Sequence, residues 1–289
     1  MNIEKCTYHG IPDCLKLSDG GIELFVTTGF GPRIIGAGFA GGQNFMRIFD
    51  EHIADVAQNE WKIYGGHRFW TSPEAYPRTY FIDNKPVSWS VEDGVLVLDS
   101  PEEKENSVKK QIKINIKDGK VQVQHVLTNI GRWEIEVSAW ALSVVAPGGT
   151  LWVPQDKYVP AGIGEGHTLL PSRSIAMWPY TDMSDARLEW GKNFVKLSEA
   201  GGSGEPLKFG VFNALGYAAY ELNGEFFVKH FAAYENCDYP DFGCNCEFYT
   251  QRGMLEVESL SPLVLLTPEE SIIHTEEWEF FHSMPDFMK

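Results

Sequence analysis

Short runs of alternating polar and apolar residues, joined by Asp-Gly turns, constrain the fold of this chain more than any other feature of its sequence. Residues 87–98 hold two such runs around Asp93-Gly94. Residues 110–117 alternate in the same way until Asp118-Gly119 leads into a further run at residues 121–126. A period of two is typical of a strand with one buried face, and Asp-Gly is typical of a tight hairpin turn. These segments are therefore predicted to form antiparallel hairpins.

The same pattern recurs towards the end of the chain, and helical periodicity is scarce. Hairpins that follow one another without helices favour a β sandwich or barrel over an α/β fold. Because no repeat of fixed period occurs, we expect residues 1–289 to form one all-β domain. Two irregular stretches, 51–80 and 154–185, are rich in Trp, Tyr, Pro and charged residues, which is typical of long loops that carry binding groups. Further strands are predicted at residues 21–27, 33–39, 134–145, 208–211, 216–222, 225–231, 254–257 and 272–281.

The composition excludes several classes of partner. Apolar residues make up 43% of the chain, enough for a large core, and the formal charge of −16 repels phosphate backbones and anionic lipids. No cluster of Lys and Arg offsets this charge, so neither nucleic acid nor a membrane surface is expected as a partner. The first residues include acid and base, unlike a signal peptide, and no later apolar run is long enough to span a bilayer. We therefore expect a cytoplasmic protein.

The cysteines indicate neither disulfides nor a metal site. There are five, an odd and scattered number that does not resemble the disulfide framework of a secreted domain. Cys237 and the pair Cys244-Asn-Cys246 lack the spacing of a zinc site, and no second pair of ligands follows. We expect reduced thiols and no bound metal.

Two glutamates alternate with apolar residues near the carboxyl end of the chain. Because successive side chains of a strand point in opposite directions, Glu256 and Glu258 share one face, and Leu255 and Val257 share the other. Alternating glutamates usually lie on a solvated surface, and the pattern alone favours that interpretation. If the face instead lines a cleft, crowding of like charges and partial loss of water raise the pKa of one carboxyl and suit it to general-base work.

Residues 64–74 form a second candidate, interpreted as a loop that opens on glycines. This segment combines His67, Arg68, Trp70 and Glu74. Sugars present rigid arrays of hydroxyls and an apolar ring face, so their sites combine such hydrogen-bonding groups with aromatic platforms. The alternative is structural, with the rings buried as anchors and His67 as a satisfied core histidine. The local sequence supports both interpretations equally.

The remaining candidates are individually weak. His125 lies on the apolar face of its predicted strand, which is usual for a core histidine, and Lys229 and Asp241 flank a turn-rich segment. The sequence contains no Gly-x-Ser-x-Gly elbow, no Walker loop, no His-Glu-x-x-His and no dinucleotide fingerprint. Hydrolases of that type, nucleotide-dependent enzymes and zinc proteases therefore have no support.

The order of these segments resembles that of the galactose-mutarotase-like superfamily, over most of the chain. The resemblance is closest to bacterial members that share a Gly-Gly-His-Arg-hydrophobic-Trp motif. The segments that carry it are residues 31–44, 65–70, 127–131, 255–262, 268–271 and 274–278.

The resemblance implies a large antiparallel β supersandwich with a cleft for a monosaccharide or for the sugar end of an oligosaccharide. In classical members a glutamate takes the proton of the anomeric hydroxyl while a histidine protonates the ring oxygen. Glu258, which a proline follows closely, best matches the catalytic glutamate, with Glu256 as the alternative, and His67 resembles a sugar-contacting or acid histidine. No cofactor is implied. Substrate contacts are expected from Arg68, Trp70, Glu74, His125, Trp140, Lys229, Asp241 and Glu256.

One position departs from the family pattern. After residues 127–131, related epimerases carry a histidine on the next strand, but here residues 137–144 contain Trp140 and no histidine. Indole stacks on sugars but cannot act as an acid at neutral pH. The leading hypothesis is an aldose 1-epimerase-like isomerase of a neutral sugar, with Glu258 as base and His67 as acid. The alternatives are a non-catalytic carbohydrate-binding protein and, less favoured without a helical partner domain, a lyase-like or hydrolase-like enzyme.

Overall fold

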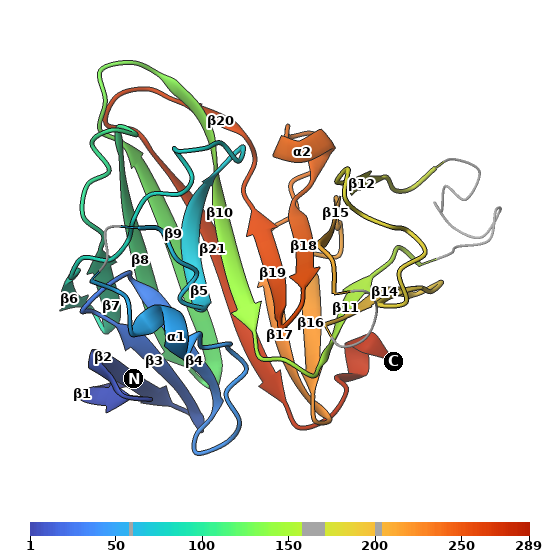
Figure 1. Cartoon of the computed structure of the whole chain (residues 1–289), viewed down its shortest axis with the longest axis horizontal. Helices are drawn as coiled ribbons and strands as arrows, with labels where there is room; N and C mark the ends of the chain where they lie inside the picture. Colours follow the sequence, from blue (N-terminus) through green and yellow to red (C-terminus); the bar gives the residue numbers. More distant parts are fainter. Residues whose placement is uncertain (58–59, 158–170, 200–203) are drawn as a thin grey trace.

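The computed structural model describes residues 1–57, 60–157, 171–199 and 204–289, and strands dominate it (Figure 1). In this described part, one sheet has eleven strands, and β20 pairs with β10 beside the main path. In spatial order the strands are β1 (Asn2–Tyr8), β2 (Ile11–Asp19), β3 (Ile22–Thr27), β4 (Arg33–Phe39), β5 (Gly66–Ser72), β10 (Ile135–Val145), β19 (Met254–Leu260), β18 (Cys246–Gln251), β15 (Leu207–Val211) and β12 (Ile175–Met177), with β20 (Val264–Leu266) at the side.

The second sheet has ten strands among the described residues, and its pairs are antiparallel like those of the first. Two short helices, α1 (Asp50–Ile53) and α2 (Pro240–Gly243), and a 3-10 turn (Asp286–Met288) complete the regular structure of that part. In spatial order the strands are β13 (Leu188–Trp190), β14 (Phe194–Ser198), β11 (Thr150–Pro154), β16 (Tyr217–Leu222), β17 (Glu225–Phe231), β21 (Ser271–Phe281), β9 (Lys120–Asn129), β8 (Val108–Lys117), β7 (Val95–Asp99) and β6 (Ser88–Glu92). The predicted antiparallel β sandwich is confirmed.

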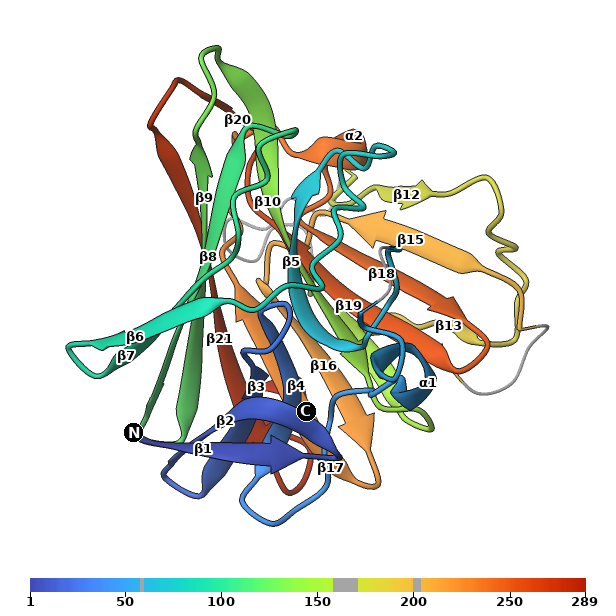
Figure 2. The same ribbon diagram turned by 60° about the vertical axis from the view of Figure 1, so that its left-hand side comes forward.

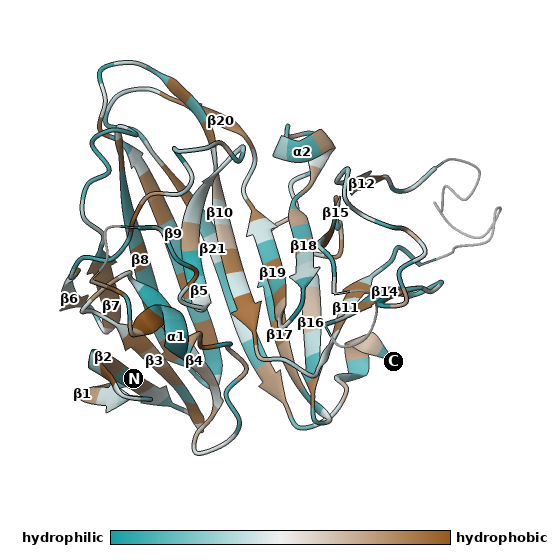
Figure 3. Ribbon diagram, viewed as in Figure 1, coloured by the Kyte–Doolittle hydropathy of each residue, from teal (hydrophilic) through white to brown (hydrophobic). Residues whose placement is uncertain are grey.

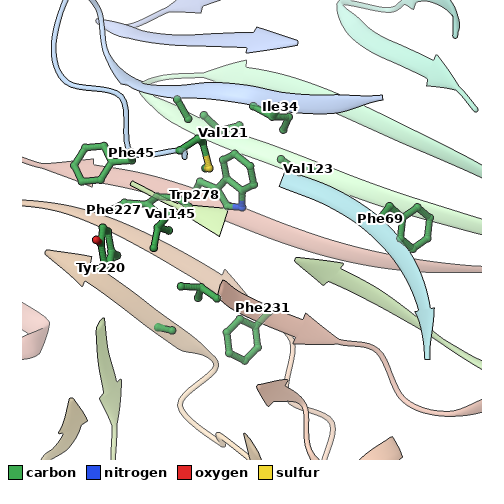
Figure 4. Packing of buried hydrophobic residues seen from close by; sticks show 14 of the residues in the cluster. Ile34, Phe45, Phe69, Val121, Val123, Val145, Tyr220, Phe227, Phe231 and Trp278 are labelled. Carbon is green, nitrogen blue, oxygen red and sulfur yellow. The ribbon is translucent and has the colours of Figure 1, made fainter. Parts of the chain in front are cut away.

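The two sheets pack face to face around one large apolar core (Figure 2). Phe69 of the eleven-stranded sheet and Val121, Phe227 and Trp278 of the ten-stranded sheet all belong to this core (Figure 4). Alternating apolar and polar residues along strands such as β19 produce the bands of colour in Figure 3. The inner face of each sheet is therefore free to fill the core while the outer face carries other groups.

The predicted hairpins form at the expected turns. β6 pairs with β7 around Asp93 (φ 50°) and Gly94 (φ 80°), and β8 pairs with β9 around Asp118 (φ 54°) and Gly119 (φ 76°). Positive φ at both central residues matches the twist of the flanking strands, which is why Asp-Gly suits these positions. Within the described residues, no helix is both long and apolar enough to cross a membrane.

The prediction of a loop over residues 51–80 is wrong in its centre. Residues Gly66–Ser72 form β5, and all seven are buried between β4 and β10. Polar residues on both faces hide the usual strand pattern here, because a strand in the middle of a sheet can satisfy them with partners on either side. In the other predicted loop, 154–185, β12 is a strand, and residues 158–170 lie outside the described residues.

Two glycines make the start of β5 possible. Gly65 (φ 92°) and Gly66 (φ 67°) have backbone conformations that other residues rarely adopt. A Cβ on Gly65 would overlap the Arg47 carbonyl oxygen, and one on Gly66 would overlap the Ile34 carbonyl oxygen. The Gly-Gly dipeptide therefore lets β5 enter the sheet between two close backbones.

We predict that Gly66→Ala destabilises the protein by about 2 to 4 kcal/mol, because backbone strain and overpacking add. Gly224→Ala is the matched control, since Gly224 also has positive φ (81°) but no atom lies within 4 Å of its Cβ position. That variant should cost only about 1 kcal/mol. Urea unfolding measures both, and equal costs would contradict the steric argument.

Candidate functional site

A cavity of about 530 Å³ lies on the outer face of the eleven-stranded sheet. Strand register explains which side chains reach it. Leu142 of β10 is directly opposite Arg68 of β5 and Glu258 of β19, so these three point to the same side. Their neighbours Phe69 and Val257 point inwards and belong to the core. The predicted common face of Glu256 and Glu258 is therefore a wall of the cavity rather than a solvated surface.

Aromatic rings form much of the cavity wall. Trp70 and Trp140 pack edge to face with ring centroids 5.5 Å apart, and Trp61 is 5.6 Å from Trp70. Rings in such arrangements are held firmly and present flat apolar surfaces to a ligand. The seven aromatic residues of the wall are Trp61, Trp70, Tyr80, Trp140, Trp178, Tyr180 and Tyr249.

Glu258 is the most deeply placed carboxylate of the wall, with 1% of its surface exposed. Its Oε2 accepts hydrogen bonds from Trp140 Nε1 at 2.9 Å and from Lys208 Nζ at 3.1 Å. Burial raises the pKa of this carboxyl and the Lys208 ammonium opposes the rise. The carboxylate therefore has one fixed oxygen and a basicity above that of an exposed glutamate.

The two cations of the wall are already paired. Arg68 Nη1 lies 2.8 Å from Glu256 Oε1, and the guanidinium lies over the Trp70 ring at 4.2 Å from its centroid. Lys208 Nζ lies 4.7 Å from the centroid of Trp140 and, like Arg68, is almost fully buried. Each cation is held by carboxylate and ring together, so its charge is largely satisfied within the protein.

Three buried polar atoms of wall residues have no hydrogen-bond partner among the described residues. They are the Trp61 Nε1 and Arg68 Nε donors and the Glu258 Oε1 acceptor. Buried polar groups without partners are costly, and at a cavity they mark positions where a ligand can supply them. The open set, two donors and one acceptor among aromatic rings, suits a ligand with several hydroxyl groups.

His67 does not reach this cavity. It is opposite Ser143 of β10, and its ring contacts the Ser143 hydroxyl on the inner face of the sheet. None of the His67 surface is exposed. His67 and Glu258 therefore lie on opposite faces of the eleven-stranded sheet. The assignment of His67 as acid partner of Glu258 must be corrected, because strand alternation that brings Arg68 and Trp70 to the cavity sends His67 to the core.

A second polar cluster, the intersheet cluster, lies beneath the cavity between the sheets. Lys229 Nζ of β17 lies 2.8 Å from Glu276 Oε1 and donates to Ser143 Oγ at 3.2 Å. Trp278 Nε1 donates to the other oxygen of Glu276 at 2.8 Å. None of these four side chains is exposed. The buried charge pair is thus hydrogen-bonded at both ends, which is the condition for burying it without a large penalty.

Three histidines, His67, His125 and His274, extend the intersheet cluster. The hydrogen-bond partners of His67 and His125 define the tautomers of these two rings. His125 Nδ1 lies 3.0 Å from the His274 carbonyl oxygen, so Nδ1 donates and Nε2 is left as an acceptor. His67 Nε2 then donates to His125 Nε2 across 2.7 Å, and His67 Nδ1 accepts from Ser143 Oγ at 2.8 Å. Both rings are neutral in this arrangement, because a proton on His125 Nε2 would bring two N–H groups together and a proton on His67 Nδ1 would displace the hydrogen bond from the Ser143 hydroxyl.

Burial acts in the same direction on all three rings. It lowers the pKa of His125 and of His274 to about 3 and lowers the pKa of His67 well below its usual value. The ligand atoms of His67, His125 and Glu276 lie within 4.8 Å of one another, as in a metal site. A divalent ion here would lie beside the Lys229 ammonium and would displace the bond between the rings. The intersheet cluster therefore fits a closed hydrogen-bond network better than a metal site.

The other predicted site residues divide in the same way. Arg68, Trp70, Glu74, Trp140 and Glu256 line the cavity with Glu258. His125 and Lys229 do not contribute to its wall, because both side chains are fully buried in the intersheet cluster. Asp241 lies in α2, a turn with φ of 51° at this residue, and is not part of the wall either.

Sequence reasoning missed several wall residues. Lys208 was predicted only as the start of a strand, and Tyr249 was not singled out, although Glu247, Tyr249 and Gln251 alternate in the sequence as residues of one face. A lysine next to apolar residues in a strand was the available signal for Lys208. Trp61, Trp178 and Tyr180 come from segments without strand pattern, and nothing local indicates that they converge.

No model of a protein family and no curated protein matches the sequence. Solved structures do match. Slr1438 from Synechocystis sp. PCC 6803 is similar, with a TM-score of 0.59 and 11% identity over 93% of this chain and 96% of that one. A galactose mutarotase-like protein from Clostridium acetobutylicum has a TM-score of 0.55 and 11% identity over 92% and 94%. A galactose mutarotase-like protein from Lactobacillus casei ATCC 334 has a TM-score of 0.54 and 9% identity, over 92% of this chain and 99% of that one.

This chain has the galactose-mutarotase-like fold. The supersandwich implied by the resemblance of sequence segments is thereby confirmed. Because only 9% to 11% of the aligned residues are identical, the likeness to these galactose mutarotase-like proteins shows the arrangement of the strands alone.

We predict that acidification unfolds the protein through the intersheet cluster. The folded-state pKa of His125 is lowered from 6.5 to about 3, so the unfolded chain binds more protons between these values. The stability contributed by the neutral ring is complete above about pH 6.5 and is lost as pH falls towards about 3. Urea unfolding at pH 7.5 and 5.0 should show this loss.

The control is a pair of variants. His125→Gln, which removes the titrating ring, should reduce the fall in stability between the two pH values, whereas His9→Asn in the exposed turn between β1 and β2 should leave it unchanged. An unaltered fall in His125→Gln would show that other groups cause the acid sensitivity.

Proposed function

We propose that the aromatic cavity binds a neutral sugar and that Glu258 accepts the proton of its anomeric hydroxyl, as in an aldose 1-epimerase. The observation that carries this proposal is the Glu258 carboxylate in the cavity wall, with Oε2 held by Trp140 and Lys208 and with Oε1 buried without a hydrogen-bond partner among the described residues. A general base requires an orientated, partly desolvated carboxylate with a free oxygen, and this geometry supplies one.

The remaining wall groups support a sugar as the ligand. Trp61 Nε1 and Arg68 Nε can donate to hydroxyl oxygens, and the rings can stack on the apolar face of the sugar. The mutarotase-like fold of the solved structures adds support at the level of the fold.

The base would start the reaction, and phenol donors of the same wall would assist it. When Glu258 removes the anomeric proton, the bond from C1 to the ring oxygen breaks, and that oxygen needs a proton or a strong hydrogen bond. Burial raises the pKa of Tyr249 to about 12 and raises that of Tyr180, so both phenols stay protonated and remain donors. They can stabilise the developing charge but are weaker acids than an imidazole.

A second candidate function is sugar binding without catalysis. One observation favours it, which is that no histidine lines the cavity among the residues that the structure describes. Ring opening without an efficient acid would be slow, whereas binding needs only the rings and the open hydrogen-bonding atoms. The two functions differ in whether Glu258 changes a rate.

We predict that Glu258→Gln lowers the rate of mutarotation of fresh α-glucose or α-galactose by about 100-fold or more, the usual contribution of a general base. Polarimetry measures the rate, and titration monitored by tryptophan fluorescence measures binding, which the isosteric amide should largely preserve. Glu102→Gln, in an exposed turn, is the matched control and should retain full activity.

Two other outcomes are informative. Equal rates for the wild type and Glu258→Gln, both above the uncatalysed rate, would remove Glu258 from the mechanism. Saturable binding with no acceleration by the wild type would select the non-catalytic function.

We also predict that free hexose binds at least about tenfold more tightly than hexose 6-phosphate. Arg68 and Lys208 are both engaged with carboxylates, so the wall offers a dianion no unpaired cation among the described residues. Calorimetric titration with each sugar measures the ratio. Tighter binding of the phosphate would contradict the neutral-sugar assignment.

A further inference from the structure

A third glutamate lies next to Glu258 but outside the cavity wall. Glu247 of β18 is directly opposite Glu258 of β19, and on its other side it is opposite Gly210 of β15. Side chains opposite one another in antiparallel strands share a face and lie close together. None of the Glu247 surface is exposed. Glu247 is therefore a buried neighbour of the proposed base.

One ammonium lies between the two carboxyl groups. Lys208 Nζ is 2.7 Å from Glu247 Oε2 and 3.1 Å from Glu258 Oε2. Apart from this contact with Lys208, neither Glu247 oxygen has a hydrogen-bond partner among the described residues. Glu258, in contrast, accepts from both Lys208 and Trp140.

The surroundings of Glu247 do not favour an anion. A Cβ on Gly210 would lie 3.1 Å from Glu247 Cγ and 2.6 Å from Cys244 Sγ, so the carboxyl side chain and the thiol fill the space above this glycine. The charged and titratable groups of the described residues that act on Glu247 are Lys208, Glu258, Asp241, Cys244 and Cys246, and of these only Lys208 is a cation. Two buried carboxylates around one ammonium would leave an uncompensated negative charge.

We propose that Glu247 is held as a neutral carboxylic acid behind the cavity, so that Lys208 pairs with Glu258 alone and keeps it ionised. The hydrogen-bond pattern decides which carboxyl carries the proton. Lys208 contacts both carboxyl groups, whereas the Trp140 indole donates to Glu258 alone and favours its anionic form. Glu247 is thus a positioning residue that acts through Lys208. Environments that move the pKa values of two neighbouring carboxyl groups apart leave one as an acid and the other as a base.

The functional consequence rests on the proposed function. If Glu247 ionised, it would compete with Glu258 for Lys208 and turn the ammonium away from the base. We therefore expect mutarotation by the wild type to fall at alkaline pH, in kcat more than in KM. The isosteric neutral variant Glu247→Gln should lack this alkaline fall and should keep a rate within about threefold of the wild type at pH 7.

The protonation state itself can be tested without a sugar. In protein labelled with ¹³C at the glutamate side-chain carboxyl carbon, the resonance missing from Glu247→Gln belongs to Glu247, and the one missing from Glu258→Gln belongs to Glu258. Glu247→Asp provides the first assignment if the amide variant does not fold. In the wild type at pH 7, we expect the chemical shift of a neutral acid for Glu247 and that of a carboxylate for Glu258.

The outcomes separate the two proposals. A carboxylate shift for Glu247 at pH 7, or a neutral-acid shift for Glu258, would overturn the inference whatever the activity. The expected shifts together with no mutarotation would support the inference about Glu247 while the catalytic function fails. Expected shifts with an alkaline fall that persists in Glu247→Gln would show that Glu247 does not act through Lys208.

Discussion

The position of the cavity depends on one ammonium buried between the sheets. Besides Glu276, Lys229 of β17 donates to the backbone carbonyl oxygens of Ala141 at 3.1 Å and of Val257 at 2.9 Å. These residues precede Leu142 and Glu258, which point the other way into the cavity wall. Burial lowers the pKa of Lys229, and Glu276 opposes this effect. A charge in the core therefore ties the ten-stranded sheet to β19, which carries the proposed base, and to its neighbour β10.

Alternation along β5, β10 and β19 separates two polar systems that the sequence mixes. His67 and Arg68 are adjacent in the chain, yet one belongs to the intersheet cluster and the other to the cavity. The same step separates Ser143 from Leu142 and Ser259 from Glu258. β5 and β19 are polar on both faces as a result, with Arg68 paired to Glu256 on one side and His67 bonded to Ser143 on the other. In β5 this hides the pattern by which strands are normally recognised.

Features that depend on local sequence could be predicted, whereas features that depend on the pairing of distant strands could not. Asp93-Gly94 and Asp118-Gly119 predict hairpins because the turn chemistry is local, and the shared face of Glu256 and Glu258 follows from the geometry of one strand. The position of His67 depends instead on the register of β5 against β10, which residues 64–74 alone do not specify. Lys208 lies close to Glu258, Trp140 and Trp178 only after strands distant in the sequence have paired.

The two faces of these strands also differ in how their charges balance. In the intersheet cluster one ammonium, Lys229, meets one carboxylate, Glu276, and neutral rings complete the network. On the cavity face Lys208 meets Glu247 and Glu258, so the balance is reached only when one carboxyl keeps its proton. A buried ammonium that faces one carboxylate is balanced and holds the sheets together. Two carboxyl groups that share one ammonium are coupled, and the proton they share can move between them at modest cost in free energy. Under the proposed function, the face that would need a proton acceptor is the one on which carboxyl groups outnumber ammonium groups.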